Sequence, residues 1–184
     1  MYKYILIALF AMLAMSSCIS CESGKEVKVE KKEVKKERVL TIHYYWMGGG
    51  EQYNMNGYIA STLHDAVRGP FRIATKKLSE AVNGRIRFVE VSDILSADMT
   101  LCATNVNPSI LAFWDKRNSM LAINMNASGG NLMQTMMHEI GHSLSLPHSG
   151  DPNSFMYWSA HGGIGSPMIT DEDVKNMMRI IEGN

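Results

Sequence analysis

The sequence predicts an α+β domain over residues 39–184, built from about five strands and several amphipathic helices. Two kinds of segment indicate this fold class. Short runs rich in β-branched and aromatic residues occur between stretches in which apolar residues recur every three or four positions. Glycine, proline and asparagine separate these segments, as turns require. The chain has 184 residues, and the part expected to fold has the size of one domain.

The first part of the chain, residues 1–20, is interpreted as an export signal. Lys3 supplies a positive charge, and the apolar run Tyr4–Met15 is too short to span a membrane. Met15-Ser16-Ser17-Cys18 resembles a bacterial lipobox, whose cysteine becomes the lipidated first residue of the mature chain. We therefore expect a lipid anchor on Cys18, with Cys21 as a weaker candidate, and attachment to a bacterial membrane or cell surface. The alternative is an ordinary secretory signal that yields a secreted protein.

Residues 21–38 predict a charged tether between the signal and the domain. Residues 22–38 carry seven basic and five acidic side chains and no aromatic residue, so this segment cannot bury enough surface to fold alone. Glutamates spread among the lysines disfavour a patch for anionic lipid or nucleic acid. The remaining chain keeps 10 of the 18 basic and 13 of the 18 acidic residues. This balance argues against a nucleic-acid partner.

Five segments have the composition of strands. Their bounds are Val39–Trp46, Arg85–Val91, Ala97–Cys102, Ser109–Trp114 and Met120–Met125. Gly48-Gly49-Gly50 ends the first strand, and Asn83-Gly84 turns the chain into the second. The last two strands are expected to pair as a hairpin. His43 and Cys102 are interpreted as ordinary strand residues, and Cys102 as a small buried hydrophobe.

Helical spacing marks three other segments. From Tyr58 to Val67 apolar residues recur at helical intervals, and Arg68-Gly69-Pro70 interrupts that run. Pro70 suits the first turn of a second helix, which we expect to reach about Val82. Together these two pieces predict one long helical segment, the backing helix, either continuous or broken at Arg68-Gly69-Pro70. Near the C-terminus, Thr170 caps a final helix with acidic residues in its first turn.

A further helix carries two histidines on one face. Asn131 can cap it, and Gln134 stands three residues on, in the position of a capping pair. His138 and His142 are four residues apart, so both imidazoles leave the same face, about 6 Å apart along the axis. This spacing lets two neutral ring nitrogens bind one zinc ion at ~2.0–2.1 Å.

The residues after this helix complete a metal site. Pro147 prevents the helix from continuing, so the chain can turn back and present His148 as the third ligand. Three histidines leave the fourth position of a single Zn²⁺ ion open for water, as in catalytic zinc sites. Glu139 lies beside His138 but not on the ligand face, where it can hold that water.

The stretch from His138 to His148 resembles the zinc signature of metzincin peptidases, His-Glu-x-x-His-x-x-Gly-x-x-His, in the form of the matrixins, the matrix-metalloprotease-like branch. At one position the sequence departs from it, because Ser145 replaces the glycine of a sharp turn. A non-glycine residue with positive φ costs on the order of 1 kcal/mol, so either Ser145 is strained or the turn is built differently. Further on, Ser154-Phe155-Met156-Tyr157 resembles the Met-turn, with Met156 as a floor beneath the zinc ligands.

The resemblance implies a metzincin-like fold and a zinc endopeptidase. The sheet would be mixed, mostly parallel and twisted, with the histidine-bearing helix, the backing helix and the C-terminal helix around it. The enzyme would be a monomer that hydrolyses peptide bonds of extracellular proteins or peptides, with Glu139 as general base. No cysteine switch, second-zinc histidine cluster or calcium loop of the animal enzymes is recognisable in the sequence. A reduced, bacterial-type domain is the closer resemblance.

The same resemblance suggests where substrate would lie. In the family, the first strand of the hairpin borders the cleft, so the backbone of Ile110, Leu111 and Ala112 would face an extended peptide. Tyr157 and Trp158 would line the pocket for the side chain that follows the cleaved bond. On the residues alone, this strand can simply cover the core, and the two aromatic side chains can be core packing.

Two other functions are compatible with these residues. In a gluzincin-type peptidase, Glu172 would replace the third histidine, and zinc content after His148→Ala or Glu172→Ala separates that scheme from ours. A surface lipoprotein that binds zinc or peptide without cleavage is the other alternative. His161 is a substitute for the third ligand, although His148 has the better spacing.

Overall fold

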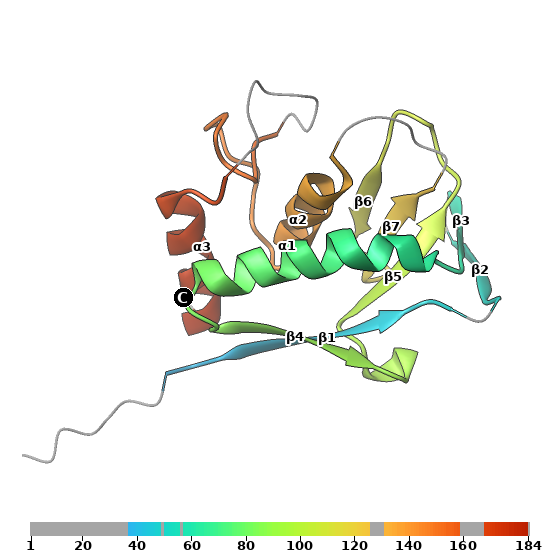
Figure 1. Cartoon of the computed structure of the whole chain (residues 1–184), viewed down its shortest axis with the longest axis horizontal. Coiled ribbons are helices and arrows are strands. Elements are labelled where there is room, and N and C mark those ends of the chain that lie inside the picture. The colour runs from blue at the N-terminus through green and yellow to red at the C-terminus, as the bar shows by residue number, and fades with distance from the viewer. Residues whose placement is uncertain (1–36, 49, 56, 126–130, 159–167, 184) are drawn as a thin grey trace, which may run out of the picture. The chain divides into compact units, whose positions relative to one another are not determined.

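The computed structural model describes residues 37–48, 50–55, 57–125, 131–158 and 168–183, which all belong to one unit of the chain, Lys36–Asn184 (Figure 1). The expected signal, Cys18, Cys21 and almost all of the expected tether lie outside the described residues, and so does His161. Within the described ranges, no helix is both long enough and apolar enough to cross a bilayer.

A seven-stranded mixed sheet forms the centre of the described fold. Its strands are β1 (Leu40–Trp46), β2 (Gln52–Met55), β3 (Tyr58–Ser61), β4 (Ile86–Val91), β5 (Met99–Thr104), β6 (Ala112–Asp115) and β7 (Met120–Asn124). Strands β2, β3, β5, β1 and β4 are neighbours in that order, while β7 pairs with β5 and β6 pairs with β7. The pairs β1–β4, β1–β5 and β5–β7 are parallel, and β2–β3, β3–β5 and β6–β7 are antiparallel. The expected α+β class is confirmed, with two strands more than predicted.

One of the two additional strands, β3, lies in a segment for which we predicted a helix, and the other, β2, lies just before that segment. The prediction of a helix over Tyr58–Val67 is wrong, because its first residues form β3, which pairs with β2 around Gly57 (φ 102°). Side chains there alternate as in a strand, since Ile59 is exposed and Ala60 is buried. Only Asp65–Val67 is helical, as a 3₁₀ turn (η1). In so short a segment, the spacing of apolar residues did not distinguish the helical repeat from the two-residue repeat of a strand.

The five predicted strands correspond to β1, β4, β5, β6 and β7, with shifted ends. Strand β5 begins two residues later than expected, after a 3₁₀ turn over Ile94–Ser96 (η2) that Asp93 caps. Strand β6 begins at Ala112 rather than Ser109, because the preceding residues form a turn in which the Asn107 side chain accepts a hydrogen bond from the Ser109 N–H. The predicted hairpin of β6 and β7 is confirmed.

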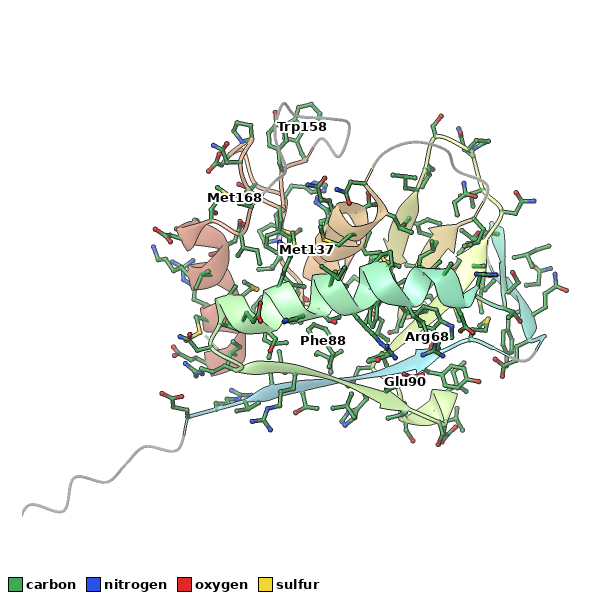
Figure 2. All side chains as sticks on the ribbon, viewed as in Figure 1. Arg68, Phe88, Glu90, Met137, Trp158 and Met168 are labelled. Atoms are coloured by element: carbon green, nitrogen blue, oxygen red, sulfur yellow. The ribbon has the colours of Figure 1, made fainter. Side chains whose placement is uncertain are left out.

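In the part of the chain that the structure describes, three α-helices lie beside the sheet: α1 (Arg68–Ala81), α2 (Leu132–Ser143) and α3 (Asp171–Glu182). Arg68-Gly69-Pro70 does not break a helix but opens α1, since the first turn needs no N–H from proline. Arg68 also joins α1 to β4 through a 2.8 Å bond from its guanidinium to Glu90 (Figure 2). Helix α3 has the expected Thr170 cap, here as a full capping box with Asp173, and ends at left-handed Gly183.

Apolar residues form two clusters in the described fold. The larger includes Phe71 of α1, Ile140 of α2, Met177 of α3 and Leu101 of β5. Helix α1 runs across α2 in Figure 1, so the long backing helix covers the helix that carries the histidines. The smaller cluster contains Cys102, which follows Leu101 in β5 and so faces the opposite side of the sheet. Burial raises the pKa of the Cys102 thiol to about 12, as expected of a small buried hydrophobe.

Candidate metal centre

Helix α2 presents two of the three predicted ligands. The Asn131 side chain caps it by accepting a hydrogen bond from the Gln134 N–H at 3.2 Å. His138 and His142 leave the same face, with ring centroids 4.7 Å apart. The helix ends at Ser143. It therefore stops well before Pro147, which we expected to mark the stop.

The turn after α2 shows how Ser145 replaces the glycine. Ser145 has a φ of 68°, in the left-handed region. Its N–H donates to the His142 carbonyl at 2.9 Å, and the Leu146 N–H donates to the Gly141 carbonyl at 3.0 Å. This pair of bonds is the Schellman end of a helix. The turn is thus the one that a glycine favours, and Ser145 carries a strain of about 1 kcal/mol.

The three histidines converge on one point. Nε2 of His142 lies 3.1 Å from Nε2 of His138 and 3.0 Å from Nε2 of His148. The possible ligand atoms of all three side chains lie within 4.8 Å of one another. A tetrahedral zinc ion with Zn–N bonds of ~2.0–2.1 Å separates its nitrogens by about 3.4 Å. Small adjustments of the rings bring this cluster to that geometry.

Hydrogen bonds at the opposite ring atoms determine which nitrogens can bind a metal. Nδ1–H of His138 donates to the Phe155 carbonyl at 2.8 Å, and Nδ1–H of His142 donates to the Leu146 carbonyl at 3.0 Å. A neutral ring that donates through Nδ1 has its lone pair on Nε2. Lone pairs that face each other at about 3 Å repel unless a cation lies between them. The donor set therefore fits zinc, and the Phe155 and Leu146 carbonyls orient two of the rings.

Burial favours the neutral form that a ligand requires. His138 is buried, His142 is half-buried and His148 is exposed. Burial lowers the pKa of His138, and the neighbouring His142 and His148 rings lower it further, although its bond to Phe155 acts in the opposite direction. Burial also lowers the pKa of His142. The two helix-borne rings are therefore neutral at pH 7, ready to bind a cation.

Glu139 lies next to the cluster without belonging to it. One of its carboxylate oxygens, Oε2, accepts a 2.8 Å hydrogen bond from the Trp114 N–H of β6. Burial raises the pKa of the Glu139 carboxyl to about 7 in the metal-free chain, although the bond from Trp114 lowers it. A carboxyl group whose pKa lies near 7, beside a candidate metal site, can both take up and release a proton.

Met156 lies beneath the histidine helix at 2% exposure. Gly141, between the two helix-borne histidines, has no side chain, and a Cβ at that position would overlap the Met156 sulfur and crowd the Phe155 ring. The glycine therefore allows the helix to rest directly on the Met156 side chain. The sequence pattern contains Gly141, but its contact surface is visible only in the fold.

A buried polar network supports the segment that contains Met156. The Ser154 hydroxyl donates to Asp173 Oδ1 at 2.7 Å and accepts a hydrogen bond from the Met156 N–H at 2.9 Å. The other oxygen of Asp173 accepts from the N–H and hydroxyl of Thr170 at 2.9 and 2.8 Å. The network joins the start of α3 to the turn whose Phe155 carbonyl orients His138. Sequence reasoning recognised the Thr170 cap but missed its link to Ser154.

The residues expected to face substrate lie at the end of the sheet next to α2. Ile110 uses its backbone within the turn, since its N–H donates to the Asn107 carbonyl and its carbonyl accepts from the Asn124 side chain, both at 2.9 Å. The Leu111 carbonyl accepts from the Asn124 N–H at 2.8 Å. Of these three residues only Ala112 lies in β6, where it is the first residue. The pairing partner of β6 in the described sheet is β7.

The two aromatic residues after Met156 are placed differently. Tyr157 is half-buried, and its ring lies 5.6 Å from that of Trp158. Trp158 is 65% exposed and extends from the surface in Figure 2, as does Met168, so Trp158 is not core packing. The Ser149 N–H donates to the Met156 carbonyl at 2.7 Å, which fixes the turn beside the His148 loop.

Glu172, the ligand of the alternative peptidase scheme, lies elsewhere. Its side chain is 63% exposed and pairs with Lys175 at 3.5 Å on the outer face of α3. Among the described residues, the cluster able to hold a metal consists of the three histidines and does not include Glu172.

Residues 112–181 match the Matrixin family of peptidases. The matched part begins at β6 and extends into α3, so it includes the three histidines, Glu139 and the Met156 turn. No curated protein matches the chain. The match and the histidine cluster together support a matrixin-like zinc metallopeptidase.

Proposed function

We propose that this protein is a zinc-dependent endopeptidase that cleaves extended segments of extracellular proteins or peptides. The observation that carries the proposal is the convergence of three Nε2 atoms at the helix that also carries a half-buried carboxylate, Glu139, which is not part of the cluster. A structural zinc site has four protein ligands, whereas three ligands with a neighbouring acid are typical of hydrolytic sites. The match to the Matrixin family supports this class of chemistry.

In the proposed hydrolysis, the histidines would bind the metal and Glu139 would transfer the proton. A zinc ion held by His138, His142 and His148 supplies a Lewis acid that activates water and polarises the scissile carbonyl. The Glu139 carboxylate takes a proton from the attacking water and then donates it to the leaving amine. Its burial supports both steps, because a pKa near 7 favours neither form strongly.

An extended substrate would pair with the edge of the sheet at β6. Strand β6 forms its ladder with β7 on one side, and its other side faces α2 and Glu139. A peptide that adds to this edge would use the backbone of Ala112, and its scissile bond would then lie near the histidine cluster. Exposed Trp158 and half-buried Tyr157 would contact a substrate side chain from the opposite side of α2.

A fluorogenic peptide library, assayed with and without a zinc chelator, tests the function. We expect cleavage by the zinc-loaded protein and none after chelation. Glu139→Gln should keep its zinc and lose roughly 10²- to 10⁴-fold in turnover, the usual contribution of a general base. Hydrolysis by this variant at the wild-type rate would exclude the role of Glu139. Zinc-loaded protein that binds peptides from the library but cleaves none would favour the non-catalytic alternative.

The proposal also includes export and a lipid anchor on Cys18. The apolar run and the Met15–Cys18 pattern of the sequence support it. Metabolic labelling with a radioactive fatty acid should mark the full-length protein and its Cys21→Ala variant, but not Cys18→Ala. Label retained on Cys18→Ala and lost from Cys21→Ala would move the anchor to Cys21. No label on any of the three proteins would favour the secreted alternative.

A further inference from the structure

One backbone amide of the sheet edge points at the candidate catalytic carboxylate. Trp114 lies opposite Leu121 in the antiparallel β6–β7 pair, yet its N–H donates away from β7, to Glu139 Oε2 at 2.8 Å. The ladder explains this direction. The Leu111 carbonyl accepts a hydrogen bond from the Asn124 N–H, so the backbone N–H and C=O groups of Leu111 and Phe113 point toward β7. Those of the alternate residues, Ala112 and Trp114, point away from β7.

Strand β6 is held in place on more than one side, which makes this amide a fixed donor. The Phe113 ring meets the Tyr58 ring edge-on, with centroids 5.1 Å apart. The Tyr58 hydroxyl donates to Asp115 Oδ2 at 2.9 Å, and Asp115 also accepts from the Arg117 N–H in the turn to β7. By contrast, Glu139 reaches the site through a side chain with several rotatable bonds, so its position depends on its partner.

We propose that Trp114 is a positioning residue whose backbone N–H holds Oε2 of Glu139 and leaves Oε1 to exchange the proton. The inference rests on the proposed function. Oε1 has no hydrogen-bond partner among the described residues, whereas Oε2 has this one. The indole is not needed for the role, since the donor belongs to the backbone.

The arrangement also relates the base to the substrate. Ala112 is two residues before Trp114, so its N–H points out of the same edge. Strand β6 would therefore position both groups: Ala112 would pair with the substrate backbone, and Trp114 would hold the Glu139 carboxylate. The distance between the base and the scissile bond is then set by the spacing of two amides within β6.

Selective ¹⁵N-tryptophan labelling tests the contact directly, because the chain has three tryptophans. The Trp114 amide is assigned by loss of its signal in Trp114→Phe. We expect Glu139→Ala to shift the Trp114 amide proton upfield and to speed its hydrogen exchange about 10-fold or more, as the loss of a bond to a carboxylate should do. The Trp46 amide, within β1, serves as the internal control and should not change. A Trp114 amide unaltered in Glu139→Ala would overturn the inference.

Replacement of the Trp114 amide by an ester, through incorporation of the α-hydroxy analogue of tryptophan, tests the consequence. We expect kcat to fall on the order of 10-fold with KM and zinc content unchanged, since one charge-assisted hydrogen bond is lost. Trp114→Phe, which keeps the N–H but loses the indole, should lose less of kcat than the ester protein does. An ester protein with wild-type kcat would overturn the positioning role. If the wild-type protein cleaves no peptide, the proposed function fails, while the amide measurements still decide whether Trp114 holds Glu139.

Discussion

The Ser154 hydroxyl and the Asp173 carboxylate form a 2.7 Å hydrogen bond in the interior, where Ser154 is fully buried and Asp173 is 4% exposed. The two residues belong to different segments, and the bond fixes the Met156 turn against the start of α3. Because the Phe155 carbonyl of that turn accepts the Nδ1–H of His138, the pair stabilises the orientation of a predicted zinc ligand.

Ser154→Ala should destabilise the protein by about 1–3 kcal/mol, because it leaves one buried oxygen of Asp173 and the Met156 N–H without their partner. It should also weaken zinc affinity by up to about 10-fold, because Ser154 acts on His138 only through the position of the Phe155 carbonyl. Denaturant unfolding and competition with a zinc chelator measure the two effects. Glu172→Gln changes an exposed acid of the same helical turn and should leave both values within ±0.5 kcal/mol. Equal effects of the two substitutions would contradict the role of the network.

Gly141→Ala should destabilise the protein by about 1–3 kcal/mol, since the added methyl group overlaps the Met156 side chain. Gly69→Ala is the matched control, because Gly69 also lies in a helix but has open space around its Cβ position. There the substitution should be neutral or stabilising by up to about 1 kcal/mol. Thermal unfolding of both variants checks the prediction. Combining Gly141→Ala with Met156→Ala should recover part of the loss if the overlap is the cause.

Ser145→Gly should preserve zinc binding and raise the stability by up to about 1 kcal/mol, because glycine adopts the observed φ of 68° without strain. Ser145→Val should lower the stability by more than that, since a β-branched residue resists the left-handed region. Chemical denaturation of the metal-free proteins gives both values. A glycine variant less stable than the wild type would show that the Ser145 side chain contributes more than its backbone costs.

Glu139→Gln should stabilise the metal-free protein, and more so at higher pH. The folded pKa of Glu139 is raised from 4.5 to about 7, so its contribution to stability is fully present below the unfolded value of 4.5 and is lost as pH rises through 7. The variant lacks this loss. Its advantage over the wild type should grow by on the order of 3 kcal/mol between pH 4.5 and pH 7.5. Denaturant titrations at several pH values measure it, and a constant difference would show that Glu139 does not titrate as its burial requires.

Several features that local sequence determines were predicted, whereas two hydrogen bonds between distant segments were missed. The spacing of His138 and His142, the Asn131 cap and the Thr170 cap are set within one or two helical turns. By contrast, the bond from Trp114 to Glu139 and the bond from Ser154 to Asp173 join residues 25 and 19 positions apart. No periodicity encodes such pairs, because they depend on how the elements pack.

The β2–β3 hairpin shows a different reason for failure. Ile59, Leu63 and Val67 recur every four residues, which suggested a helix. In the structure Leu63 and Val67 are buried and Ile59 is exposed, so these three residues do not form one buried face. The pairing of β3 with β2 and β5 determined the conformation instead. Four-residue strands are too short for their alternation to be distinguished from helical spacing.

The three clustered histidine rings range from a buried His138 to an exposed His148, and this gives the cluster a closed side and an open side. His138 and His142 are anchored on α2 and bonded to carbonyls, whereas His148 lies in the loop beyond the helix. We therefore expect a bound ion to leave past the His148 ring, the most exposed of the three. Changes in the His148 loop should govern how long a metal stays bound, while changes in α2 should govern whether the site forms.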